Sequence, residues 1–163
     1  MPRFRLLTAA VISALTAVPA TAAAMTPPTS PVALGSTIAG RYWGAVPCHG
    51  QIKVLVQQPA PAALGQDSDA WVTFSSSLGA NNLAAPASSY TSCTIALGRS
   101  RWPTTASMLQ DWDMLCMTMT HEFGHLLGHA HTATQANVMN AVFTNYTSEP
   151  WLCRTDKPIE SRR

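Results

Sequence analysis

The sequence predicts a single small domain of the α+β class, and three observations support this prediction. Beyond residue 41, short runs of β-branched and aromatic residues alternate with Pro- and Gly-rich stretches, as in short strands joined by turns. Beyond Pro103 the apolar residues recur at steps of three and four, which is the spacing of one helix face. The chain has 163 residues, enough for one hydrophobic core and too few for two ordinary domains once a targeting segment is removed.

The first 24 residues have the layout of a secretory signal peptide. Arg3 and Arg5 precede an apolar run at 6–18, and small residues follow it. This run is shorter than the roughly 20 residues that a membrane-spanning helix needs. We therefore expect residues 1–24 to be removed and the protein to be secreted, without a stable membrane anchor.

Residues 25–40 combine Pro, Thr, Ser and Gly without apolar periodicity. We expect them to form a flexible leader or a short pro-segment, so that the single folded domain covers residues 41–163.

Three strands and one long helix are expected in this domain. The strands are predicted near 51–56, 70–76 and 91–98, the first from the alternation of Ile52, Val54 and Val56. A helix is predicted over 105–127, starting at a Thr104 or Thr105 cap and ending at Gly128. Its apolar face is interpreted as core and consists of Met108, Leu109, Trp112, Leu115, Met119, Phe123, Leu126 and Leu127.

The four cysteines all follow the signal peptide, and an exported protein favours two disulfides. Three pairings are possible. We favour Cys48 with Cys93, which flank the strand region, and Cys116 with Cys153, which bracket a histidine-rich segment. A cysteine metal site is not expected, because the chain has no Cys-x-x-Cys pair.

The charge balance argues against a nucleic-acid partner. Ten basic and eight acidic residues become eight and eight once the segment with Arg3 and Arg5 is removed, so the mature net charge is near zero. We expect a monomer that binds neither nucleic acid nor a membrane.

Four of the five histidines lie between residues 121 and 131. On a helix, His121 and His125 share a face with their Cβ atoms about 5–6 Å apart, so both can bind one metal ion. Glu122 is adjacent and is the candidate general base. Catalytic Zn²⁺ takes three protein ligands and keeps a fourth position open. A positive φ at Gly128 would let the chain fold back and bring His131 into the same coordination sphere.

The segment "HEFGHLLGHAH" resembles the zinc-binding motif His-Glu-x-x-His-x-x-Gly-x-x-His of the metzincin metallopeptidases at every specified position. Met139 resembles the methionine of the metzincin Met-turn, which lies under the metal. Thr132, where matrixins carry Ser, makes the chain most similar to the matrixin branch, as a secreted member of bacterial type.

The resemblance implies a zincin-like fold with a twisted, mostly parallel sheet, one antiparallel edge strand and a long active-site helix. It implies one catalytic zinc held by His121, His125 and His131. Family members often bind structural calcium and a second zinc as well, but only Asp67 and Asp69 stand in the corresponding upstream loops, so calcium is not expected. The proline that usually follows the Met-turn is also missing after Met139.

The expected function is that of a secreted zinc-dependent endopeptidase with Glu122 as general base. A polypeptide substrate would bind in extended form along an edge strand, which the resemblance places at 82–89. Val142 and Phe143 would wall the pocket on the leaving-group side. His129 and His49 are expected to be surface residues.

Two other functions remain open. One is a non-catalytic, zinc-stabilised binding or toxin-like module on the same fold. The other is hydrolysis of a non-peptide amide, such as a cell-wall crosslink. Glu122 argues against the first, because a structural zinc site normally has four protein ligands and needs no base.

Overall fold

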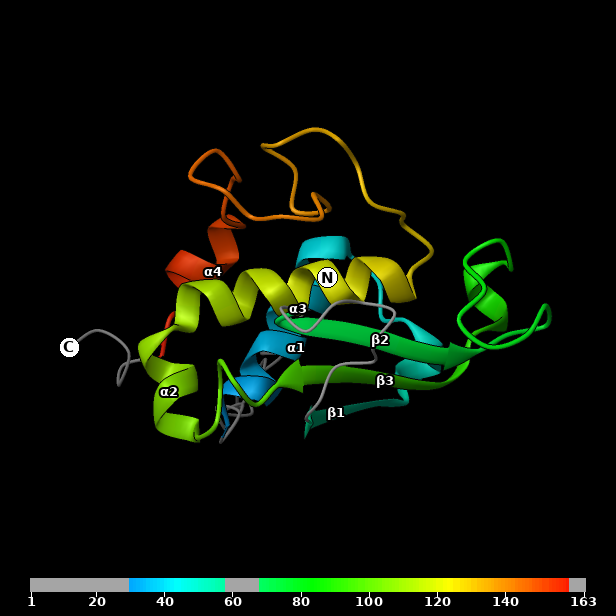
Figure 1. The fold of residues 1–163 in the computed structure, drawn as a ribbon, viewed down its shortest axis with the longest axis horizontal. Helices are drawn as coiled ribbons and strands as arrows, with labels where there is room; N and C mark the ends of the chain where they lie inside the picture. Colours follow the sequence, from blue (N-terminus) through cyan, green and yellow to red (C-terminus); the bar gives the residue numbers. More distant parts are fainter. Residues whose placement is uncertain (1–29, 58–67, 159–163) are drawn as a thin grey trace, which may run out of the picture.

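The computed structural model describes residues 30–57 and 68–158 (Figure 1). The predicted signal peptide, residues 1–24, lies outside these ranges. In the described part of the chain no helix has the length and apolar character needed to cross a bilayer. In chain order the elements are α1 (Pro31–Trp43), η1 (Cys48–Gly50), β1 (Ile52–Gln57), β2 (Ala70–Ser75), η3 (Ala87–Ser89), β3 (Thr91–Gly98), α2 (Thr105–Gln110), α3 (Trp112–Leu126) and α4 (Trp151–Thr155).

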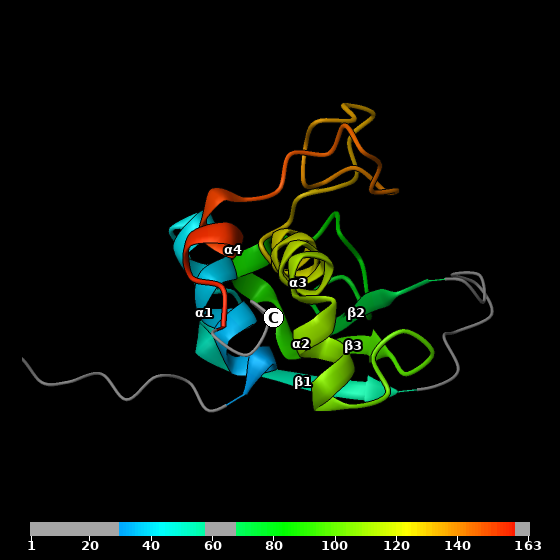
Figure 2. The same ribbon diagram turned by 90° about the vertical axis from the view of Figure 1, so that its left-hand side faces the viewer.

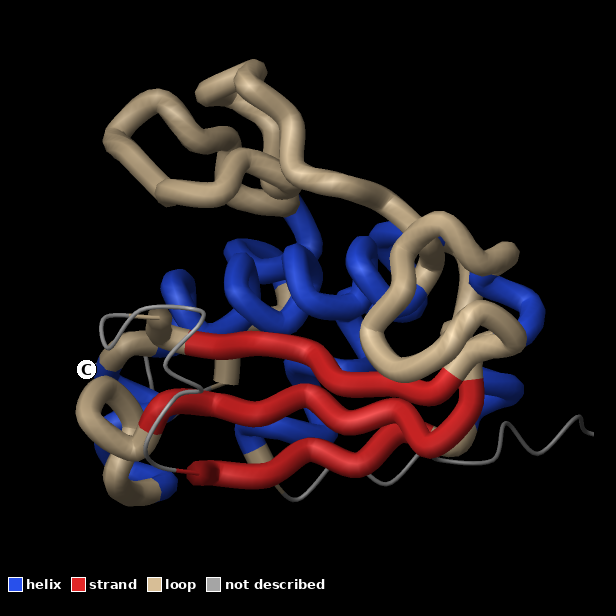
Figure 3. The backbone as a smooth tube through the Cα atoms, turned by 45° about the vertical axis from the view of Figure 1, so that its right-hand side comes forward, coloured by secondary structure: helices blue, strands red, loops and turns tan. Residues whose placement is uncertain are grey.

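The three strands form a mixed sheet with the order β1-β3-β2. β1 runs parallel to β3, with Ile52 opposite Cys93, and β2 runs antiparallel to β3 at the other edge. The α+β class and the antiparallel edge strand are therefore as predicted, while the sheet has one parallel and one antiparallel pairing and is not mostly parallel. The helices lie behind one face of this sheet (Figure 3).

Helix α1 occupies most of residues 25–40, the segment that was expected to be a flexible leader or a short pro-segment. The expected flexibility is wrong for residues 31–40, which are helical, while residues 25–29 lie outside the described residues. The Ser30 side chain accepts a hydrogen bond from the Ala33 amide, and Pro31 occupies the first turn, where its missing N–H costs nothing. Ile38 and Ala39 are fully buried. The helix thus depends on packing against α3 more than on the propensity of its own Gly, Ser and Thr residues.

The predicted helix over 105–127 is divided into α2 and α3 at Asp111. This residue has non-helical backbone angles, with φ −105° and ψ 35°. Its carboxylate accepts hydrogen bonds from Arg101 Nε at 2.7 Å and from Trp102 Nε1 at 3.1 Å. These contacts hold the residue between two helix axes, and periodicity cannot reveal them because the apolar spacing continues across the break. Thr104 caps α2 in a capping box with Ser107, in line with one of the two predicted caps.

Residues 82–89 are not a strand, so the edge strand that the resemblance placed there is absent from these residues. Asn82 accepts hydrogen bonds from Ala84 and Ala85, which makes a turn, and Pro86 lacks the N–H that a ladder requires. The Tyr90 hydroxyl donates to the Ala85 carbonyl and fixes the end of this loop. Within the described residues, β2 is the antiparallel edge strand of the sheet.

Both favoured disulfides are present. Cys48–Cys93 joins η1 to β3, and Cys116–Cys153 joins α3 to α4. An ion pair between Arg41 and Asp156 connects α1 to α4 as well. The helices are therefore cross-linked around α3, which Figure 2 shows almost end-on between the sheet and the loop that follows it.

Candidate metal centre

The three predicted ligands converge at the C-terminal end of α3. Their Nε2 atoms lie 3.0 Å apart for His121 and His125, 3.1 Å for His125 and His131, and 3.2 Å for His121 and His131. In the described part of the chain this is the one group of three or more His, Cys, Asp or Glu residues that could hold a metal ion. The structure therefore brings together all three residues that the sequence nominated.

Backbone carbonyls fix the protonation pattern of two of these rings. His121 Nδ1 lies 2.7 Å from the Val138 oxygen, and His125 Nδ1 lies 2.8 Å from the His129 oxygen. A carbonyl oxygen can only accept, so in each ring Nδ1 carries the proton and a neutral ring presents a lone pair at Nε2. Two lone pairs 3.0 Å apart repel each other unless a cation lies between them.

The donor set fits Zn²⁺. A tetrahedral ion with Zn–N distances of about 2.0–2.1 Å would hold its nitrogen ligands about 3.3–3.4 Å apart, close to the spacing observed here. Histidine ligands of zinc usually donate their other N–H to a carbonyl or carboxylate, and His121 and His125 both do so.

Burial favours the neutral form of the two helical ligands. The pKa of His121 is lowered to about 4, mainly by loss of solvent and to a smaller extent by the nearby His125 and His131, while the Val138 carbonyl acts in the opposite direction. Burial likewise lowers the pKa of His125. Neutral imidazoles are the form that binds a metal, so the centre is prepared for one at neutral pH.

Glu122 directly follows His121 and is almost completely shielded from solvent. Its side chain lines the same cleft as the three histidines, although the residue is only 5% exposed. Burial raises the pKa of Glu122 to about 8 in the absence of a cation. A carboxyl group in this environment can hold a proton near neutral pH, which is the property of a general base that must take up a proton and then release it.

The reversal of the chain after α3 is made as the sequence predicts. Gly128 has a φ of +89°, a conformation that only glycine adopts without cost. The Gly128 amide donates to the His125 carbonyl, and the His129 amide donates to the Gly124 carbonyl. These bonds end the helix and turn the chain so that His131 faces the two helical ligands.

Met139 packs on α3 at Gly124, the residue before His125. It is buried, and its amide donates to the Asn137 side chain while its carbonyl accepts from the Thr132 amide. Its sulfur occupies the space that a side chain at Gly124 would need. The missing Cβ of Gly124 thus lets the Met139 loop, with the Val138 carbonyl that orients His121, approach the helix.

Gly124→Ala should disturb this centre. A Cβ at this position would lie 2.8 Å from Trp43 Cζ2 and closer still to the Met139 sulfur, so both side chains would have to move. We expect a loss of about 1–3 kcal/mol in the free energy of unfolding, together with weaker zinc binding. Denaturant unfolding and chelator competition measure the two effects. Gly40→Ala, inside helix α1, where a Cβ would meet only ordinary contacts at 3.8 Å, is the matched control for adding a methyl group to a helical glycine.

The triad opens into a cleft of about 840 Å³ between β2 and the loop after Met139. Trp71 and Val72 of β2 line one side, and Val142 and Phe143 line the other. The Phe143 ring contacts His121 edge-on with 5.5 Å between centroids. Val142 and Phe143 thus line the cleft that contains the histidines, and their place on the leaving-group side stays a prediction.

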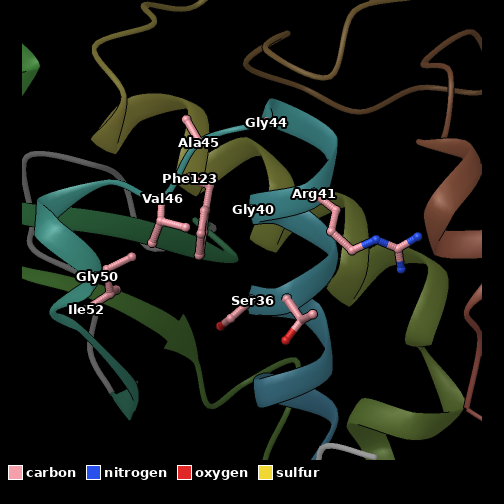
Figure 4. Close-up of a pocket in the computed structure, with 10 residues that line it drawn as sticks. Ser36, Gly40, Arg41, Gly44, Ala45, Val46, Gly50, Ile52 and Phe123 are labelled. Atoms are coloured by element: carbon pink, nitrogen blue, oxygen red, sulfur yellow. The ribbon is translucent and has the colours of Figure 1, made fainter. Parts of the chain in front are cut away.

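Another cavity, shown in Figure 4, lies on α1 and the segment after it, with Ser36, Gly40, Val46 and Phe123 in its lining. None of the three clustered histidines lines it, so it is not part of the metal centre.

Sequence reasoning missed three contributors to the centre: the carbonyl of Val138, the carbonyl of His129 and the missing side chain of Gly124. The last had a visible signal, because a glycine inside a helix costs about 1 kcal/mol relative to alanine and so suggests a packing reason. The two carbonyls had none. His129 and His49 are exposed, as expected.

Three imidazoles on a helix and the loop after it, with a carboxylate beside them in an open cleft, are the arrangement found in zinc metallopeptidases. The family model for matrixins matches residues 46–157, and the chain therefore belongs to the matrixin family. No curated protein and no solved structure matches the chain.

Proposed function

We propose that this protein is a zinc-dependent endopeptidase that acts outside the cell, with Glu122 as its general base. The observation that carries the proposal is the convergence of three Nε2 atoms within 3.2 Å, next to a buried Glu122 and in a cleft open to substrate. Membership of the matrixin family supports it. The two disulfides support export, because such bonds persist in oxidising compartments.

His121, His125 and His131 would hold the metal. When bound, zinc would lower the pKa of a water molecule toward about 7 and polarise the scissile carbonyl. Glu122 takes the proton of the attacking water and returns it to the leaving amine. Its burial excludes bulk water, which would otherwise compete for the same proton.

The substrate would lie extended along β2. In the described residues β2 pairs only with β3, so the backbone groups along its other edge have no strand partner. Trp71 and Val72 of this strand line the cleft that contains the triad. Main-chain hydrogen bonds to such an edge give affinity for many sequences, while Val142 and Phe143 contact the side chain on the leaving-group side.

Purified mature protein should contain about one zinc per chain and should cut an unfolded protein. Metal analysis measures the first property, and a peptide library measures the second and reports the residues preferred around the cut. If zinc is bound and no peptide is cut, the chain is a zinc-stabilised binding module. If no zinc binds, the proposal fails altogether.

A further inference from the structure

We infer that Trp43, the last residue of α1, is a positioning residue for the metal centre. It lies outside the residues that the matrixin model matches, 46–157, and in a segment that the sequence did not connect with the site. The inference rests on the proposed zinc centre and adds a component to it. Helix α1, through Trp43, would then help to orient a ligand of the metal centre.

Two contacts of the Trp43 indole involve residues that flank the helical ligands along the chain. Its Nε1–H donates to the Thr120 carbonyl at 2.8 Å, and Thr120 directly precedes His121. Its ring stacks on the His129 ring, with 4.6 Å between centroids and 18° between planes. One rigid side chain thus connects the body of α3 to the loop that follows it.

The His129 contact leads directly to a ligand. The carbonyl of His129 accepts the Nδ1 proton of His125 at 2.8 Å, and this bond sets both the tautomer and the direction of the His125 ring. His129 lies beyond the end of α3 and is itself exposed. Its backbone bonds to Gly124 and to the His125 ring, and the stack on Trp43 restrains its side chain.

The same indole also packs against α3 at Gly124. Its Cζ2 atom lies 2.8 Å from where a Cβ of Gly124 would be, in the space shared with the Met139 side chain. Trp43 therefore contacts the α3 backbone beside His121, the residue that orients His125, and the surroundings of the Met139 loop. Losing the Trp43 ring should leave the orientation of the His125 ring less restrained without removing any metal ligand.

The test is zinc affinity, measured by competition between the zinc-loaded protein and a chromophoric chelator at pH 7. Trp43→Leu removes the ring, and His129→Ala removes the stack while keeping the backbone carbonyl. We expect each to weaken zinc binding by about 10-fold or more, the usual effect of losing a residue that orients a ligand. The double variant should be little weaker than the worse single variant, because both changes remove the same stack.

Two further variants separate positioning from general stability. His129→Phe keeps a flat ring in place of the imidazole and should restore zinc affinity to within about 3-fold of wild type. Trp151→Leu changes another tryptophan, 59% exposed on α4, and should leave zinc affinity unchanged.

The inference is overturned if His129→Ala binds zinc as tightly as wild type, or if His129→Phe is no better than His129→Ala. It is overturned also if Trp43→Leu lowers the unfolding temperature while the folded protein keeps wild-type affinity. If Trp43→Leu does not fold, the two His129 variants decide the question. Wild-type protein that binds no zinc at all would instead contradict the proposed function.

Discussion

Replacing Glu122 by Gln should strongly reduce peptide cleavage while leaving zinc bound. The amide has nearly the shape of the carboxyl group and fits the same buried position, but it cannot accept a proton from the attacking water. General-base catalysis is worth about 10²- to 10⁴-fold, so kcat/KM should fall by that factor. The measurement is the initial rate on the best peptide from the library, with zinc content determined on the same sample.

Glu149→Gln is the matched control for this change. Glu149 is another partly buried carboxylate, paired with Arg154 outside the cleft, and its removal should leave kcat/KM within a factor of two. Cleavage by the Glu122 variant at the wild-type rate would reject the assigned base. Loss of zinc from that variant would mean that the substitution disturbs the three ligands, and the rate would then say nothing about proton transfer.

The metal centre could be predicted because its geometry is mostly local. His121 and His125 are one helical turn apart, Gly128 supplies the reversal, and His131 follows within the reach of that turn, so that spacing along the chain fixes spacing in space. Met139 was identified through its resemblance to a Met-turn. The structure adds why it fits: Gly124 leaves room for its side chain.

What could not be predicted depends on contacts between distant segments. Helix α1 has weak helix formers and is stabilised by burying Ile38 and Ala39. The break at Asp111 comes from hydrogen bonds donated by Arg101 and Trp102, ten and nine residues away. The free edge of β2 follows from strand order, and a pattern of short strands does not give that order.

The stability of the metal-free protein should depend on pH through Glu122. Burial raises the pKa of Glu122 from 4.5 to about 8, so in the folded chain this carboxyl group still holds its proton where the unfolded chain has lost it. Its contribution to stability is fully present below pH 4.5 and is lost as the pH rises through 8. The loss amounts to at most about 5 kcal/mol, since one pKa unit corresponds to about 1.4 kcal/mol.

His121 acts in the opposite direction over a different pH range. Its pKa is lowered from 6.5 to about 4, so its contribution is present above pH 6.5 and is lost as the pH falls toward 4. Wild type and Glu122→Gln share this contribution, and the difference between their unfolding free energies isolates Glu122. Relative to Glu122→Gln, wild type should become less stable between pH 5 and pH 8 when chelator-treated samples are unfolded in denaturant.

Zinc should remove most of this pH dependence. A divalent cation beside the carboxyl group favours its ionised form and lowers its pKa toward the unfolded value. The zinc-loaded pair of proteins should therefore show a smaller change between pH 5 and 8 than the metal-free pair. An equally steep change with and without zinc would mean that the carboxyl group of Glu122 does not sense the ion, and it could not then act on a water held there.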